Sequence, residues 1–184
     1  MPKIVNISRV DIITDTISVD SCHRIKNKLG RINSKDSTVE FNIWDHVAGD
    51  PDFDLLKSKF LECANLLVKT NSNTVDNLTL GRGWPVGYKD WEYQAPHHHG
   101  STFVVGVAYI DVSDDSGDLL VQDPLAAYDW IDRTDKRMNG NCRASIPVTP
   151  VTGMIIVMPG YLIHSTEPKP AGKTRLVLAT NFDK

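Results

Sequence analysis

The sequence is poor in cysteine and has no surplus of basic residues. Its three cysteines, Cys22, Cys63 and Cys142, are odd in number and far apart, so they fit neither a disulfide framework nor a zinc-binding spacing. Lys and Arg total 20 against 23 Asp and Glu, which gives a formal charge of -3 at pH 7. Because no positive excess exists to neutralise phosphates, we expect no nucleic-acid partner.

Long apolar runs are missing as well. No window approaches the roughly 18 apolar residues of a membrane-spanning helix, and residues 1–6 lack the apolar run of a secretory signal. Scattered thiols in a chain without such a signal suit a reducing compartment. We therefore expect a cytoplasmic protein with no membrane partner.

The rest of the composition is typical of a globular protein, since 41% of the 184 residues are apolar and 23% are charged. This length suffices for one sizeable core, and no repeat, low-complexity tract or linker divides the chain. We expect a single domain over residues 1–184, in which a helical support region at 1–75 packs on a β-rich core at 76–184.

Helical periodicity is confined to the N-terminal part of the chain. Residues 18–29 are expected to form a helix, because apolar residues recur at helical spacing between a possible N-cap, Ser18, and a terminating Gly30. A longer helix is expected over 51–69, where Pro51 suits the first turn. Its apolar stripe consists of Phe53, Leu56, Phe60, Ala64 and Leu67.

Short apolar runs separated by turn residues predict strands elsewhere in the chain. The expected strands lie within 4–13 and at 38–44, 78–80, 103–110, 119–121, 146–148, 154–158, 161–163 and 175–182. Many short strands with Gly and Pro turns are typical of a sandwich or barrel, with jelly rolls among the options. We therefore predict an α+β fold that is mainly β with N-terminal helices. The polar stretch 124–142 is long for a loop and suits either a lid or a plain surface excursion.

Three of the six histidines are consecutive and stand just before the most apolar run of the sequence. Because side chains alternate along a strand, His97 and His99 are expected to face one way and His98 the other. Neutral imidazole is a good ligand for iron, zinc, copper or nickel, so this pair could form half of a metal site. His164, which follows an apolar run and a tight turn, is the candidate third ligand. A polar loop and a packed core histidine are the simpler interpretations.

Arg175 begins the apolar run 175–182. A buried arginine needs a partner, because an unpaired charge is very costly inside a protein. Its planar fork of donors suits a small carboxylate bound in a bidentate manner, and an internal Asp or Glu is the alternative partner.

Taken in this order and spacing, these residues resemble the motifs of the iron(II)/2-oxoglutarate-dependent oxygenases, and within them a small phage and bacterial group. The resemblance extends over residues 80–182. The matching segments are Pro96–His99, Val105–Tyr109, Ser116–Pro124, Met158–His164 and Arg175–Phe182.

The resemblance implies a double-stranded β-helix core, that is, a cupin-like jelly roll. It also implies that Fe(II) is held by His97, His99 and His164, and that Arg175 grips the distal carboxylate of the co-substrate 2-oxoglutarate. The implied activity is that of a dioxygenase that uses O2 to hydroxylate a peptidyl side chain or a small molecule, with release of succinate and CO2.

Two positions depart from the pattern of the wider superfamily. A carboxylate usually stands where this chain has His99, so Asp111 or Asp123 is the alternative ligand, with His99 then outside the metal's immediate shell. Val177 stands where a Ser or Thr often follows the arginine by two residues. Two other functions stay open: a cupin-like metal enzyme that does not use 2-oxoglutarate, and a catalytically silent jelly roll that serves as a binding or structural module.

Overall fold

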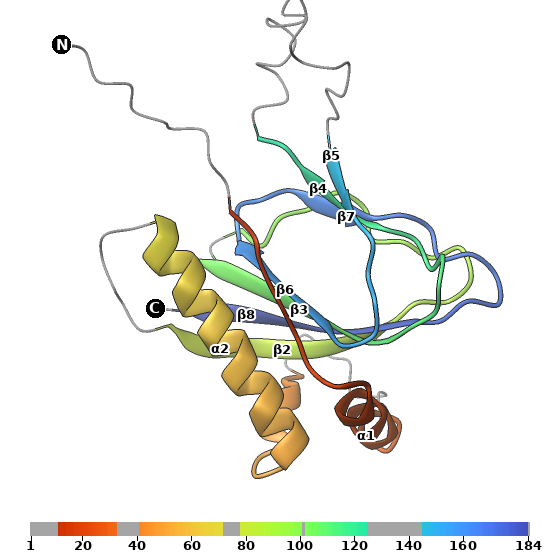
Figure 1. The fold of residues 1–184 in the computed structure, drawn as a ribbon, viewed down its shortest axis with the longest axis horizontal. Helices are drawn as coiled ribbons and strands as arrows, with labels where there is room; N and C mark the ends of the chain where they lie inside the picture. Colours follow the sequence, from red (N-terminus) through yellow and green to blue (C-terminus); the bar gives the residue numbers. More distant parts are fainter. Residues whose placement is uncertain (1–10, 33–40, 72–77, 101, 125–144, 184) are drawn as a thin grey trace, which may run out of the picture.

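The computed structural model describes residues 11–32, 41–71, 78–100, 102–124 and 145–183, which form three layers (Figure 1). Two helices lie on one face of a five-stranded sheet, and a three-stranded sheet faces its other side. The elements are β1 (Ile13–Thr16), α1 (Val19–Leu29), a 3₁₀ helix (Ile43–Asp45), α2 (Pro51–Asn71), β2 (Thr79–Gly87), β3 (Val104–Val112), β4 (Leu119–Gln122), β5 (Ser145–Val148), β6 (Met154–Pro159), β7 (His164–Thr166) and β8 (Arg175–Asp183).

All strand pairs are antiparallel. The larger sheet has the order β1-β6-β3-β8-β2 and the smaller one the order β5-β4-β7. β8 pairs with β3 on one side and with β2 on the other, so it lies inside the larger sheet rather than at its edge. The observed fold is mainly β with helices near the N-terminus, as predicted.

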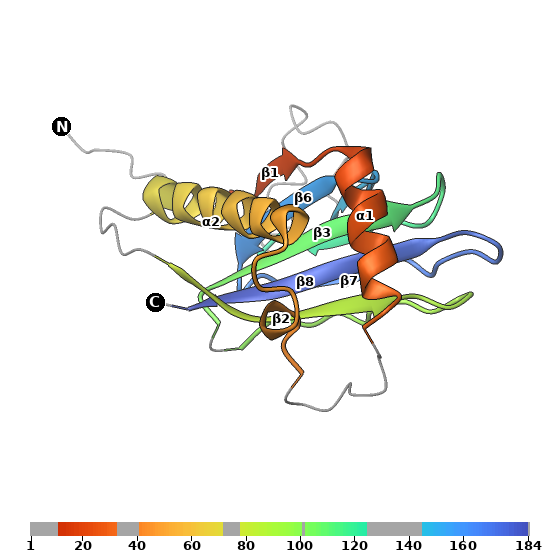
Figure 2. The ribbon, with the colours of Figure 1, turned by 90° about the horizontal axis from the view of Figure 1, so that it is seen from below.

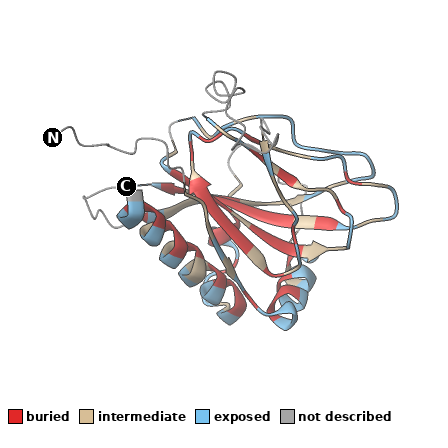
Figure 3. Ribbon diagram, turned by 45° about the horizontal axis from the view of Figure 1, so that its top comes forward, coloured by how far each residue is buried: buried red, intermediate tan, exposed pale blue. Residues whose placement is uncertain are grey.

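Both predicted helices are present, and both cover the outer face of the larger sheet (Figure 2). Ser18 caps α1, because its side chain accepts a hydrogen bond from the backbone N–H of Ser21. The faces of both helices that meet the sheet are buried, while their outer faces are exposed (Figure 3). The predicted apolar stripe of α2 forms much of the core between the helices and the larger sheet: Phe53, Leu56, Phe60, Ala64 and Leu67 are all buried.

The central strands bury both of their faces. In β8, Leu178 and Phe182 belong to the core beneath the helices, whereas Val177 belongs to a second core between the two sheets. Because strand side chains alternate with a period of two, Arg175 and Asn181 share the side of Val177. The space between the sheets is therefore where polar side chains of β8 can meet a ligand.

The predicted strand at 38–44 is wrong in the part that the structure describes, since Ile43–Asp45 forms a 3₁₀ helix. Asn42 caps it by accepting from the backbone N–H of Trp44, and the Trp44 indole donates to Thr180 Oγ1 at 3.1 Å. Ile43 and Trp44 are both buried, although neighbours in a strand face opposite ways. The contact of Trp44 with β8 therefore decides the local structure, although the alternation of apolar and polar residues favours a strand.

The predicted strand at 161–163 is also wrong. These residues form a turn between β6 and β7, in which the backbone N–H of Leu162 donates to Pro159 O at 3.0 Å. Most of the stretch 124–142, and the beginning of the strand region 4–13, lie outside the described residues. Within the described part of the chain, no helix is both long and apolar enough to cross a membrane.

The close approach of α2 to β3 gives a stability prediction. A Cβ atom at Gly106 would lie 2.8 Å from the ring of Phe60, and neither can move easily in a packed core. Gly106→Ala should therefore lower the free energy of unfolding by about 1–3 kcal/mol in urea denaturation. The matched control is Gly87→Ala, where the nearest atom is 3.8 Å away, so stability should be unchanged or slightly higher. Equal effects of the two substitutions would contradict this account of the packing.

Candidate metal centre and adjoining pocket

Two segments that are distant in sequence meet at the candidate centre. His97, in the segment that follows β2, forms an isolated antiparallel bridge with His164, the first residue of β7. The N–H of His97 donates to His164 O at 3.0 Å, and the N–H of His164 donates to His97 O at 2.9 Å. His99 is held nearby, because its N–H donates to Gly160 O at 2.8 Å.

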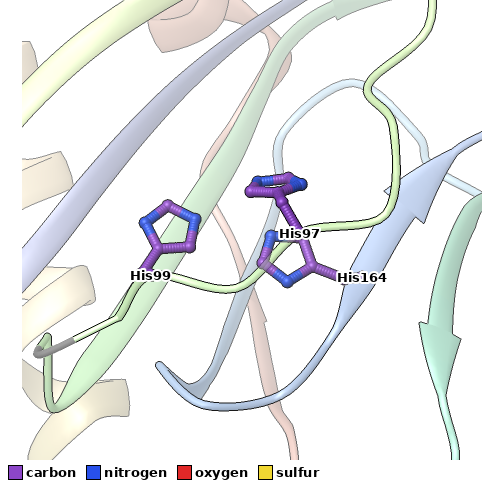
Figure 4. A group of neighbouring side chains, drawn as sticks. All are labelled: His97, His99 and His164. Carbon is purple, nitrogen blue, oxygen red and sulfur yellow. The ribbon is translucent and has the colours of Figure 1, made fainter.

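The three imidazoles point toward one another (Figure 4). Their ring centroids are separated by 4.4 Å for His97 and His164, and by 5.3 Å from each of these to His99. One ligand nitrogen from each ring lies within 4.8 Å of the other two. Nitrogen ligands bind one transition-metal ion at about 2.1 Å each, so small ring movements would bring all three onto a single ion.

The alternative ligands named from the sequence are not part of this cluster. Among the described residues, the group of metal-ligating side chains contains only His97, His99 and His164. The carboxylate of Asp111 instead accepts a hydrogen bond from Lys26 at 2.6 Å. Asp123 is likewise absent from the cluster.

Each of the three rings has its Nδ1 atom beside a carbonyl oxygen. His97 Nδ1 is 2.9 Å from Ala95 O, His164 Nδ1 is 2.9 Å from Leu162 O, and His99 Nδ1 is 2.9 Å from the amide oxygen of Asn181. A carbonyl oxygen can only accept, so Nδ1 carries the proton in each ring. The lone pair of each Nε2 is then available to a metal ion.

Burial keeps the more enclosed rings neutral. It lowers the pKa of His164 to about 4, against the opposing effect of the hydrogen bond to Leu162. Burial also lowers the pKa of His99, although the hydrogen bond to Asn181 acts in the other direction. Metal ions bind neutral imidazole, so these rings are ready to bind a metal at neutral pH without first losing a proton.

A pocket between the sheets adjoins the cluster, with about 520 Å³ of empty space that is partly open to solvent. Its walls are largely apolar, and its polar lining consists of the three histidines together with Tyr88, Gln94, Tyr109, Thr166 and Arg175. Trp84 also lines it and stacks on the His99 ring at a centroid distance of 6.0 Å. An apolar cleft with a few convergent polar groups is the usual form of a small-molecule site.

Arg175 is buried in this pocket, with 2% of its surface exposed. Its Nη1 donates to Ser116 O at 3.0 Å, its Nη2 donates to Glu167 O at 2.9 Å, and its Nε has no partner. The guanidinium carbon lies 4.2 Å from the centroid of the Tyr88 ring. The described residues give Arg175 no salt bridge. Its acceptors are backbone carbonyls and, at 3.4 Å, the hydroxyl of Thr166, rather than the internal Asp or Glu considered as the alternative.

Several residues of the site were not singled out from the sequence. Strand alternation could have identified Tyr109 and Asn181. Tyr109 lies on the same face of its strand as Val105, and Asn181 lies on the same face as Arg175. No comparable signal marks Tyr88, which lies just beyond β2, or Thr166, whose strand has only three residues.

A comparison with models of protein families identifies one family. The family described as "Putative 2OG-Fe(II) oxygenase" matches residues 82–181. No curated protein sequence matches the chain significantly.

Solved structures with the same fold include HygX from Streptomyces hygroscopicus, with nickel and 2-oxoglutarate bound, at 13% identity and a TM-score of 0.63 over 94% of this chain and 81% of HygX. A Pseudomonas putida prolyl-4-hydroxylase shares 13% identity and a TM-score of 0.63 over 95% of this chain and 89% of its own. SnoN, an α-ketoglutarate-dependent epimerase from nogalamycin biosynthesis, shares 14% identity and a TM-score of 0.65 over 95% of this chain and 78% of its own. At these identities the similarity shows the fold alone, and it confirms the predicted jelly-roll core.

The lowered pKa of His164 gives a prediction for the metal-free protein. Between pH 6.5 and about 4 the unfolded chain protonates this residue, whereas the folded protein keeps it neutral. The unfolded state therefore binds more protons, and stability should fall as the pH drops through this window. His164→Leu removes the contribution, so its free energy of unfolding should fall less than that of the wild type between pH 7 and pH 5. The measurement is urea denaturation in the presence of a chelator, and equal losses in the two proteins would contradict the prediction.

Proposed function

The chain belongs to the 2-oxoglutarate/iron(II) oxygenase family, whose sequence model matches residues 82–181, and we propose that it is a dioxygenase that hydroxylates a small molecule or a peptide side chain. The observation that carries the proposal is that one pocket contains both a cluster of three imidazole nitrogens and a buried guanidinium without a carboxylate partner among the described residues.

Fe(II) and 2-oxoglutarate are the cofactor and co-substrate of this family, and O2 is the oxidant. Together they supply an oxidative decarboxylation that yields succinate and CO2 and transfers one oxygen atom to the substrate. The task of the protein is to bind these partners, orient the substrate and exclude water.

We assign the metal-binding role to His97, His99 and His164. Three neutral imidazoles with free Nε2 atoms suit a divalent first-row metal, and this donor set fits iron. Because none of the three ligands carries a negative charge, the site keeps the full charge of the ion. A carboxylate ligand would have reduced that charge by one unit.

We assign the distal carboxylate of 2-oxoglutarate to Arg175 and the hydroxyl groups around it. The unpaired Nε of Arg175 is a buried donor without an acceptor, which is costly unless a ligand satisfies it. Tyr88 and Thr166 line the same pocket, and Arg175 Nη2 donates to Thr166 Oγ1 at 3.4 Å. Burial raises the pKa of Tyr109, so its hydroxyl stays protonated and can donate to an anion.

The guanidinium of Arg175 is held in place by the backbone. Its terminal nitrogens donate to carbonyl oxygens in the turn before β4 and in the residue that follows β7. These hydrogen bonds fix the position of the guanidinium before any ligand arrives, and a preorganised cation loses little freedom on binding. Val107, Leu119 and Val177 contribute apolar walls to the same pocket.

We further propose that residues 1–75 serve as structural support within a single domain over 1–184. The described helices bury their inner faces against the larger sheet. None of their described residues lines the pocket, so they support the site from behind without contributing to its chemistry.

Ligand-dependent stability tests the proposal as a whole. Saturating Mn(II), used in place of Fe(II), should raise the melting temperature, and 2-oxoglutarate should raise it further only when the metal is present. A ligand at 100 times its dissociation constant adds about 2.7 kcal/mol, which is easily measured. A metal effect without a 2-oxoglutarate effect would favour the metal enzyme that uses no 2-oxoglutarate, and no effect of either would favour the silent module.

The histidine triplet offers a matched pair of variants for the metal ligands. His97→Ala should abolish tight metal binding, measured by calorimetry with Mn(II), because the ring belongs to the cluster. His98→Ala should retain it, since the exposed His98 ring only accepts a hydrogen bond from the N–H of Gly100. Full metal occupancy in His97→Ala would contradict the assignment.

Substitutions at the other end of the pocket test the co-substrate site. Arg175→Ala should abolish the release of succinate, and the loss of its bonds to backbone carbonyls should also lower stability. Tyr88→Phe is the sharper variant, because it keeps the ring beneath the guanidinium and removes only the hydroxyl. Its affinity for 2-oxoglutarate should fall about tenfold, the effect of one hydrogen bond of about 1–1.5 kcal/mol, while Mn(II) affinity stays unchanged. The control is Tyr161→Phe on the exposed turn, and identical 2-oxoglutarate affinities in both variants would argue against the assignment.

A further inference from the structure

We propose that Asn181 is the positioning residue for His99: its amide oxygen fixes the tautomer and the orientation of the ring and thereby sets the affinity of the site for metal. The inference rests on the proposed function, because it takes the three histidines as the metal ligands. It adds a residue of β8 to a site whose other members come from the segment after β2 and from β7.

The two other rings do not need such help. His97 and His164 each donate to the backbone carbonyl two residues earlier, at Ala95 and Leu162. A local contact of this kind depends on the backbone alone and is independent of any other side chain.

His99 does not use the same local contact. The carbonyl two residues earlier is that of His97, which accepts the N–H of His164 at 2.9 Å in the bridge that joins the two segments. The acceptor beside the His99 ring comes from another strand instead, since Asn181 Oδ1 lies 2.9 Å from Nδ1. Of the three contacts to Nδ1, this is the one that a side-chain substitution can remove.

The backbone of Asn181 is fixed by strand pairing. It lies opposite Val105 in the pairing of β8 with β3, inside the larger sheet. On that strand it has the same facing as Arg175, so the residue that orients a metal ligand and the residue assigned to the co-substrate stand at opposite ends of one β8 face. Trp84 stacks on the His99 ring at an interplanar angle of 25°, which leaves the ring little freedom once Nδ1 is held.

The choice of an amide has a chemical consequence. A carbonyl oxygen accepts the Nδ1 proton and strengthens Nε2 as a donor without adding charge, and outer hydrogen bonds of this kind typically change metal affinity by 10–100-fold. An aspartate at the same position would accept the same proton and add one negative charge beside a site made of neutral ligands. Asn181→Asp should therefore bind a divalent metal at least as tightly as the wild type.

The test compares the wild type with Asn181→Leu, which has a similar shape but no acceptor, and with Asn181→Asp. Mn(II) titration by calorimetry should give a dissociation constant 10–100-fold higher for Asn181→Leu and rescue by Asn181→Asp. In the metal-free wild type, ¹⁵N NMR of the rings should show the proton of His99 on Nδ1, whereas Asn181→Leu should show a mixture of tautomers. The tautomer would not change if Asn181 served only to stabilise the fold.

The possible outcomes separate this inference from the proposal on which it rests. A wild type that binds no Mn(II) overturns both. Equal Mn(II) affinities in the wild type and Asn181→Leu, or a wild-type His99 that lacks the proton on Nδ1, overturn the role of Asn181 alone. If Asn181→Leu does not fold, Asn181→Ala replaces it, because the smaller side chain removes the acceptor without a clash, and the same comparison of affinities decides.

Discussion

The pair of reciprocal hydrogen bonds between His97 and His164 is the contact on which the rest of the site depends. It joins the segment after β2 to the start of β7, and in doing so it sets two imidazoles side by side. The third ring lies beside this pair, and its Nδ1 atom is 2.9 Å from Asn181 Oδ1 on β8. One short antiparallel bridge thus places two candidate ligands, and a side chain of the larger sheet contacts the third.

The layered architecture explains how the chain combines stability with a polar interior. The larger sheet is covered by helices on one face and faces the smaller sheet on the other, so its strands alternate between two apolar cores. The polar side chains of the candidate site lie on the side between the sheets, where Arg175 is stabilised by backbone carbonyls and by the ring of Tyr88. A buried cation held in this way retains an unsatisfied donor, and a dicarboxylate ligand would satisfy it.

Much of this arrangement could be predicted from the sequence. Helical spacing and capping residues located both helices, and the short apolar runs located most strands, because these signals are local. The order of the histidines and the arginine singled out four residues that the structure brings together around one pocket. What could not be predicted depends on contacts between distant segments: the 3₁₀ helix at Ile43–Asp45 follows from packing of Trp44 against Thr180, and the partners of Arg175 are carbonyls, which carry no signature in the sequence. Asn181 belongs to the segment 175–182 that the sequence singled out, but its contact with His99 joins residues 82 positions apart and is visible only in the structure.

The position of β8 has a consequence for how the site is assembled. This strand follows every other described strand in the sequence, yet it pairs with both β3 and β2 and carries both Arg175 and Asn181. A chain whose β8 is undocked therefore lacks three things at once: the Asn181 acceptor beside the His99 ring, the Arg175 guanidinium, and the part of the pocket wall that β8 provides.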